Sequence, residues 1–313
     1  MSGYLAHVPA GRRRQRLAGY GFALLSVLGY STVELAIKIG LGELSVYQLA
    51  FWRIVLSAAI LSPTLLGWDG WRTLPWGRLL LFAALSLIGF TVAHILSLTL
   101  LSPISVATVV GITPLCLILL DSLAQRRRPG RLALLASVVG LAGLGFLTFE
   151  RGGLALSSAL GVLLAVLSAI LWSLYPAFGE SLGRDVGHHA RAFGLMNLVG
   201  APLLLLAPWM GPPAPPASLA GWLVVVYLAV VVSLGLVAFM RAIALAGAEV
   251  GVVQYSKPGW TALLATQLFG EVFTPAMAAG MLLVVAASIL SYRARAGAAA
   301  TPRTAKQGRA DKQ

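Results

Sequence analysis

Ionisable residues inside apolar segments are the part of this sequence that could do chemistry. Residues 251–271 are apolar enough to lie in a bilayer, yet the segment is interrupted by Lys257 followed by Pro258. A lysine at the centre of a bilayer costs roughly 2.5–3.5 kcal/mol on insertion scales, so it should face a cavity or a partner. A proline inside a helix removes a backbone hydrogen bond and kinks the helix. The combination is typical of the broken helices from which transporters build substrate sites.

Lys257 has two interpretations that the sequence leaves open. Its ammonium group could bind a carboxylate or phosphate of a substrate, with an attraction strengthened by the low dielectric. Alternatively, it could form a structural ion pair with Glu34. On a continuous helix, Gln254, Lys257 and Thr261 would share one face at spacings i, i+3 and i+7, and this face would line a polar cavity.

Glu34 lies on a second polar stripe, with Tyr30 and Lys38 at helical spacing. A desolvated carboxyl group can exchange a proton during a transport cycle, or it can remain the counter-ion of Lys257 or Arg53 throughout. His94 is a second candidate for proton coupling, because an imidazole ordinarily titrates near neutral pH. The alternative for His94 is a hydrogen bond between helices.

The remaining candidate binding residues are an arginine and three aromatic residues. Arg53 could clamp a substrate carboxylate, since a guanidinium group offers bidentate geometry, or it could serve packing or reach toward the headgroups. Trp172, Tyr175 and Tyr255 could stack on an aromatic or cationic substrate, or they could serve helix packing or an interfacial belt.

The composition identifies the kind of protein that holds these residues. Of the 313 residues, 58% are hydrophobic and only 11% are charged, whereas a soluble domain carries about 25% charged residues. About 20 apolar residues span a bilayer. This criterion predicts an all-α integral membrane protein with ten transmembrane helices, at 17–39, 45–66, 77–101, 103–124, 131–149, 158–181, 189–208, 219–246, 248–269 and 275–292.

The net charge of +13 has a topological explanation. When the first residue is placed inside, 19 of the 23 Lys and Arg residues fall on the inner side of the ten spans, and only Lys38 and Arg151 fall outside. Positive charge marks the cytoplasmic side, so both termini are predicted to be cytoplasmic, in the inner (plasma) membrane. The basic N-terminal segment 1–16 and a basic tail at 293–313, predicted to be disordered, then meet anionic membrane lipid rather than nucleic acid.

An internal repeat organises the chain. Residues 105–114 match 249–258 at an offset of 144, which carries Pro114 onto Pro258, and both prolines are predicted helix kinks. The repeat predicts two halves, 17–149 and 158–292, of five spans each. Because five is odd, the second half enters the membrane from the opposite side, which makes an inverted repeat typical of alternating-access transporters.

Several motifs in this order resemble the EamA family of the drug/metabolite transporter superfamily. The positions that carry the resemblance are Tyr30-Ser31, Lys38, Arg53, Thr113-Pro114, the segment from Ile170 through Trp172-Ser173 to Tyr175, Pro258 and Gly270-Glu271. The resemblance covers about residues 17–292. It implies a ten-helix bundle with a central cavity that moves a small metabolite, often outward, and family members are described as exporters of amino acids and other metabolites.

Three positions depart from the family pattern. The first half has Arg126-Arg127 where the family usually shows Gly-Glu, and Glu34 and Lys257 stand where such charges are unusual. These departures leave the expected fold intact and bear on the substrate.

Other functional classes lack their motifs. The chain has no phosphate-binding Gly-Lys-Ser/Thr loop, and its single Cys116 belongs to no metal-binding pattern, so no cofactor or metal is expected. The favoured function is a secondary transporter of a small-molecule substrate such as an amino acid, with a proton as the candidate coupling ion. The alternatives are a membrane-embedded lipid-handling enzyme or a channel.

Overall fold

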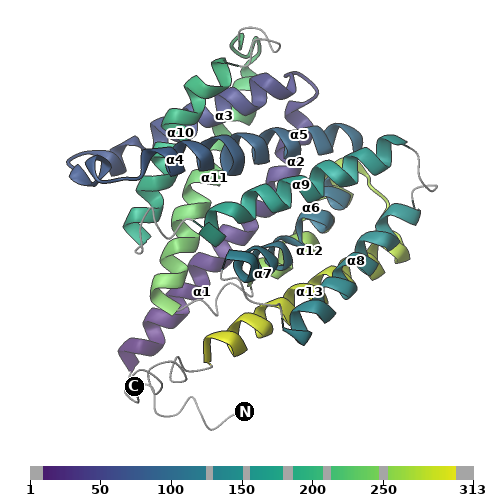
Figure 1. Ribbon diagram of the computed structural model, residues 1–313. Helices are drawn as coiled ribbons and strands as arrows, with labels where there is room; N and C mark the ends of the chain where they lie inside the picture. Colours follow the sequence, from purple (N-terminus) through teal and green to yellow (C-terminus); the bar gives the residue numbers. More distant parts are fainter. Residues whose placement is uncertain are drawn as a thin grey trace, which may run out of the picture.

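The protein is helical throughout the residues that the structure, a computed structural model, describes: 10–124, 130–150, 156–178, 186–206, 213–246 and 253–300 (Figure 1). In chain order the helices are α1 (Ala10–Ser31), α2 (Val33–Gly40), α3 (Val46–Leu61), α4 (Trp76–Phe82), α5 (Phe90–Leu100), α6 (Pro103–Val110), α7 (Thr113–Ala124), α8 (Arg131–Glu150), α9 (Leu156–Phe178), α10 (Val186–Leu205), α11 (Leu219–Ala246), α12 (Lys257–Phe269) and α13 (Pro275–Ala300). A π-helix, η3 (Ala83–Gly89), joins α4 to α5.

These helices form the ten predicted crossings, because three of the crossings consist of more than one helix. The first is α1 with α2, the third is α4 with η3 and α5, and the fourth is α6 with α7. Four segments are long and apolar enough to cross a membrane by length and composition, namely Arg14–Gly40, Val46–Leu65, Trp76–Leu100 and Leu219–Ala246. Shorter apolar helices occur within α6–α7, α8, α9, α10 and α13. The predicted all-α membrane fold of ten helices is confirmed.

The two repeated prolines, Pro114 and Pro258, lie in the first turns of helices rather than at kinks within them. α6 ends at Val110, and α7 begins at Thr113 with Pro114 in its first turn. Likewise, a 3₁₀ turn over 253–256 precedes α12, which carries Pro258 in its first turn. In a first turn the missing N–H of proline has no intrahelical acceptor to lose, so proline is well tolerated there. The prediction of two Pro-kinked helices is corrected to two helix starts at matching positions of the halves.

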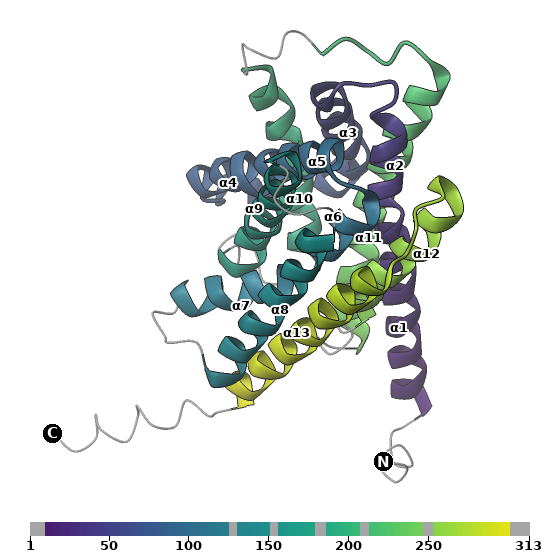
Figure 2. The ribbon, with the colours of Figure 1, turned by 90° about the vertical axis from the view of Figure 1, so that its right-hand side faces the viewer.

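The two halves of the chain are interleaved. α8 packs along α13, α3 against α10, and α6 against α12, so that equivalent crossings of the two halves meet. α1, in the first crossing of the first half, packs along α11, the third crossing of the second half. α9, the first crossing of the second half, packs along α5, in the third crossing of the first half, so the same pairing occurs with the halves exchanged. Both views show the α1–α11 and α8–α13 pairs side by side (Figures 1 and 2). The main cluster of buried apolar residues, and a small second cluster between α1 and α11, therefore both contain residues of the two halves.

The two ends of the described chain lie on one side of the molecule. Figure 2 shows the first turns of α1 and the last turns of α13 at the same, lower end. α13 extends to Ala300, so residues 293–300 continue a helix where we expected the tail to begin. Alanine is the strongest helix former, and the segment AGAAA ends this helix. Residues 1–9 and 301–313 lie outside the described residues.

A glycine on α1 sets the distance between α1 and α11. A Cβ atom built on Gly19 would lie 2.6 Å from the Cβ atom of Ala246, whereas a Cβ on Gly21 would meet nothing within 4 Å. We expect Gly19→Ala to lower the thermal unfolding temperature of the purified protein by several degrees, since overpacking costs about 1–3 kcal/mol. Gly21→Ala on the same helix is the control, and equal stability of the two variants would contradict this packing.

Candidate functional site

The site is built around a break in the first crossing. The Ser31 hydroxyl donates to the carbonyl of Val27 at 2.6 Å, and the Thr32 hydroxyl donates to the carbonyl of Gly29 at 2.6 Å. Serine and threonine can satisfy local carbonyls in this way and thereby bend or interrupt a helix. α1 ends at Ser31, α2 begins at Val33, and Glu34 follows in the first turn of α2, where its side chain is fully buried.

Lys257 reaches Glu34 from the other half of the chain. It is the first residue of α12, and its Nζ atom donates to Oε1 of Glu34 at 2.6 Å. The side chain of Lys257 is 21% exposed, whereas that of Glu34 is 0% exposed. The pair therefore has one member sealed in the core and one member that can be reached from outside it.

Two buried polar atoms at this pair lack a hydrogen-bond partner among the described residues. Nε2 of His94 lies 3.7 Å from Oε1 of Glu34, which is beyond a hydrogen bond. Oε2 of Glu34 and Nδ1 of His94 are buried and have no hydrogen-bond partner among the described residues. Buried polar groups are rarely left unpartnered, and each such case calls for an explanation. Oε2 of Glu34 can accept a proton or a cationic group, and the imidazole can hold or donate a proton nearby.

Arg53 lies next to this group but does not pair with Glu34. The Arg53 side chain is buried, and its guanidinium donates to the hydroxyl of Thr91 on α5. Thr91 precedes His94 by three residues on the same helix face. Lys257 and His94 thus lie beside the carboxylate of Glu34, and Arg53 is linked to the helix of His94 through Thr91.

Gln254 and Tyr30 connect the same region to α1 and α11. The amide Nε2 of Gln254 donates to the hydroxyl of Ser26 at 3.2 Å, and that hydroxyl donates to the carbonyl of Gly235 at 2.9 Å. The hydroxyl of Tyr30 donates to the carbonyl of Val232 at 3.4 Å. The Gln254 bond ties the turn before α12 to α1, whereas the Tyr30 bond joins α1 to α11, and neither meets the ion pair itself.

The predicted common helix face of Gln254, Lys257 and Thr261 is wrong in detail. Because α12 begins at Lys257, Gln254 belongs to the preceding 3₁₀ turn, where helical spacing does not apply. Thr261 is buried and donates to the carbonyl of Ser31 at 2.9 Å. The face of α12 that carries Lys257 therefore packs on the break between α1 and α2.

The three aromatic candidates lie in three different places. The rings of Trp172 and Phe90 lie 5.0 Å apart between centroids, and Phe90 lies 5.4 Å from His94, so Trp172 joins the buried group through Phe90. Tyr175 lies elsewhere, with its ring edge-on to Phe82 at 5.9 Å. Tyr255 is half-buried in the turn before α12.

A pair of serines repeats one contact in both halves. The Ser31 hydroxyl, which donates to Val27, also lies 3.4 Å from the carbonyl oxygen of Lys257. The Ser173 hydroxyl, which donates to the carbonyl of Ala169 at 2.7 Å, likewise lies 3.2 Å from the carbonyl oxygen of Thr113. In each case a serine in the first crossing of one half meets the residue before the proline in the other half. The ion pair itself is not repeated, because Thr113 occupies the position equivalent to Lys257.

Sequence reasoning missed several structural partners. Thr91, Phe90 and Ser26 had no periodic or charge signal that could single them out. Lys38 donates to the carbonyl of Leu98 at 2.9 Å and so satisfies the C-terminal end of α5. The described residues contain no group of three or more His, Cys, Asp or Glu side chains that could hold a metal ion.

Comparison with known proteins assigns this arrangement to a family. The sequence profile of the EamA-like transporter family matches residues 17–149 and again residues 159–293. The chain belongs to the EamA-like transporter family. The double match confirms the duplicated halves, and it makes the protein a multi-pass membrane transporter rather than an enzyme. The precise limits of the halves and of the two terminal segments stay predictions.

A solved structure, described only as "Crystal structure of protein", shares the fold of this EamA-like transporter. It is 22% identical and superposes with a TM-score of 0.62 over 91% of this chain and 98% of its own. At this identity the similarity concerns the fold alone. No curated protein matches the chain significantly.

The ion pair predicts that substitution of either partner lowers the thermal stability, but by different amounts. Lys257→Gln leaves the fully buried carboxylate of Glu34 without its cation, whereas Glu34→Gln leaves an ammonium group that is partly exposed. Breaking a buried pair costs about 3–5 kcal/mol, so we expect the thermal unfolding temperature to fall in both variants and further in Lys257→Gln.

The double variant Glu34→Gln/Lys257→Gln is the matched test of that coupling. It should recover part of the loss, because no buried charge is left unpaired. Losses that simply add, measured by thermal unfolding of the three purified variants, would show that the two side chains are not coupled.

Proposed function

We propose that this EamA-like transporter is a secondary transporter that exports a small metabolite such as an amino acid, by alternating access between its two halves. The observation that carries the proposal is the Glu34–Lys257 ion pair, which joins a helix of one half to a helix of the other at two facing helix breaks. Residues at such breaks are the common substrate sites of transporters built from inverted repeats.

The chemistry of the pair favours a substrate with both charges. A substrate carboxylate can take the place of Glu34 at the ammonium group of Lys257, which is the exposed member of the pair. A substrate ammonium group can occupy Oε2 of Glu34, which has no partner among the described residues. Binding of a zwitterion thus replaces the Glu34–Lys257 pair by two ion pairs, one at each of these residues. A neutral solute would instead leave both charges buried and unpaired.

The rest of the predicted site surrounds this exchange in the proposal. Arg53 supplies a fixed positive charge bonded to Thr91, one helical turn from His94, and Trp172 packs on Phe90 beside the group. Gln254 holds the turn that precedes Lys257 against α1, and Tyr30 holds α1 against α11. In the proposed cycle, Tyr255 and Tyr175 line the substrate cavity between the halves only in a second conformation, in which the halves are farther apart.

A proton is the coupling ion in this proposal. When Lys257 leaves Glu34, an isolated carboxylate in the core would cost several kcal/mol, so Glu34 takes up a proton as the pair separates. His94 lies 3.7 Å away and can relay this proton. The groups that face Glu34 are then Lys257 from α12 and His94 from α5, and Arg53 from α3 is bonded to Thr91 on the same helix as His94.

The proposed placement is the inner (plasma) membrane with both termini cytoplasmic. Two observations support it. The Lys and Arg residues are concentrated on one side of the predicted spans. The described ends of α1 and α13 lie on the same side of the molecule (Figure 2).

Counterflow in proteoliposomes tests the site. With a panel of labelled amino acids and other small metabolites, we expect the wild type to exchange a zwitterion and Lys257→Gln to lose at least about tenfold in rate, the loss equivalent to about 1.4 kcal/mol. Arg241→Gln, which removes an exposed cation from α11, is the control and should keep the wild-type rate. Exchange that survives Lys257→Gln would return the lysine to a purely structural role.

Proton coupling makes a separate prediction. We expect a pH gradient to drive accumulation of the transported compound in the wild type but not in Glu34→Gln. This variant loses one of the two charges that bind the substrate, so its counterflow should be slower than that of the wild type but still measurable, because exchange requires no net proton movement. The measurement is uptake with and without an imposed pH gradient. Gradient-driven accumulation by Glu34→Gln would remove Glu34 as the coupling group.

A further inference from the structure

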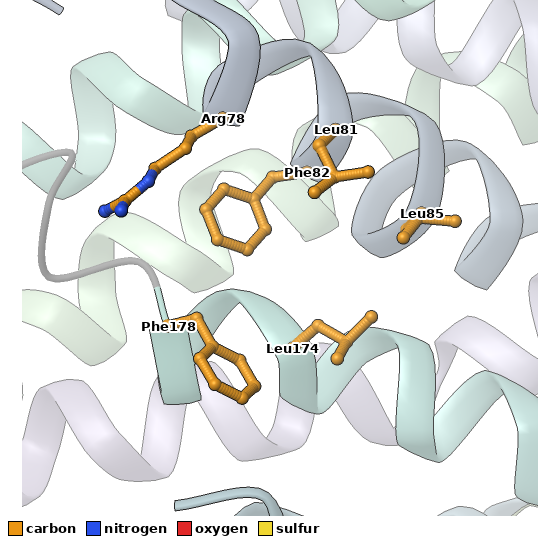
Figure 3. A pocket seen from close by; sticks show the side chains of 6 residues that line it. All are labelled: Arg78, Leu81, Phe82, Leu85, Leu174 and Phe178. Atoms are coloured by element: carbon orange, nitrogen blue, oxygen red, sulfur yellow. The ribbon is translucent and has the colours of Figure 1, made fainter. Parts of the chain in front are cut away.

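A groove on the outer surface lies apart from the buried ion pair. It has a volume of about 320 Å³ and runs between α4 with the π-helix η3 on one side and the end of α9 on the other. Its lining consists of Arg78, Leu81, Phe82, Leu85, Leu174 and Phe178 (Figure 3). One side of the groove thus belongs to the first half of the transporter and the other side to the second half.

The groove opens toward the surroundings of the protein. Leu81 is 54% exposed, Leu85 is 40% exposed and Phe178 is 37% exposed, while Phe82 forms the buried floor. In a membrane-spanning protein, such an apolar opening meets lipid chains. The π-helix widens this stretch of the third crossing, and π-helical turns often occur at functional sites.

The residues before α4 establish the depth of the groove. Trp68, Trp71 and Trp76 gather here, with Trp71 and Trp76 exposed. Arg72 lies over the ring of Trp71 at 5.3 Å, and Arg191 lies over that of Trp68 at 5.5 Å. Tryptophan and arginine concentrate at the boundary between headgroups and hydrocarbon.

Arg78 therefore stands at headgroup depth, at the mouth of an apolar groove. Figure 3 shows its side chain extending along the opening, while the leucines and phenylalanines line the space beyond it. A single guanidinium group above an apolar channel complements one phosphate joined to one acyl chain, because arginine binds phosphate through parallel hydrogen bonds.

We propose that this groove binds one anionic phospholipid. The phosphate lies on the guanidinium group of Arg78, and an acyl chain lies along Leu81, Leu85 and Leu174. The bound lipid contacts both halves of the transporter, beside the contact of Phe82 with Tyr175 that crosses the same seam. The site is independent of the substrate that the buried ion pair recognises.

Native mass spectrometry of the full chain, titrated with phosphatidylglycerol or with phosphatidylcholine of the same acyl chains, tests the proposal. We expect the first phosphatidylglycerol to bind more tightly than the first phosphatidylcholine. Arg78→Ala should weaken the first phosphatidylglycerol by about fivefold, which corresponds to about 1 kcal/mol per cation at an anionic lipid surface.

Two further variants make the outcome specific. Arg72→Ala removes a cation at the same depth but outside the groove, and it should leave the first phosphatidylglycerol unchanged. Leu85→Trp fills the groove while keeping Arg78, and it should weaken that lipid as well. Equal binding of the two lipids by the wild type, or equal losses in Arg72→Ala and Arg78→Ala, would overturn the proposal.

Discussion

A fully buried carboxylate must be paired or neutral, and Glu34 meets this requirement through a lysine from the other half of the chain. This constraint ties the position of α2 to that of α12. Both residues lie in the first turn of their helix, next to the places where the two crossings are interrupted. The ion pair thus connects local backbone structure to the relation between the two halves.

The ion pair lies in a structure whose two halves are interleaved. Equivalent crossings meet across the molecule, as α3 meets α10 and α8 meets α13, so neither half has a separate core. The two serine contacts, from Ser31 and from Ser173, follow the same exchange of halves. In this nearly symmetric arrangement, the ion pair occurs at only one of two equivalent places, because Thr113 stands at the position equivalent to Lys257. A symmetric frame with one asymmetric charge pair is well suited to two alternative arrangements of the halves, with the pair formed in one and broken in the other.

Most of the fold could be predicted from the sequence, because apolar length and the repeated prolines are direct physical signals. The partnership of Glu34 with Lys257 was also within reach, since two opposite charges at membrane depth have few other ways to be satisfied. The break at Thr32 was not predicted, because a hydroxyl that bonds to its own helix leaves no periodic signal. Arg53 illustrates the same limit, for its partner Thr91 is uncharged and distant in sequence. The groove beside Arg78 depends on how α4 and α9 approach each other, which no local pattern encodes.

The distance between α2 and α12 tests the role of the ion pair most directly. After Cys116→Ala, spin labels can be placed on cysteines introduced at two exposed positions, Ile39 of α2 and Leu268 of α12, and their separation measured by double electron–electron resonance. We predict one narrow distance with the pair intact, and a second, longer distance when Glu34→Gln removes the charge that holds Lys257. A single unchanged distance in both proteins would contradict the account, because the pair would then hold nothing that can move.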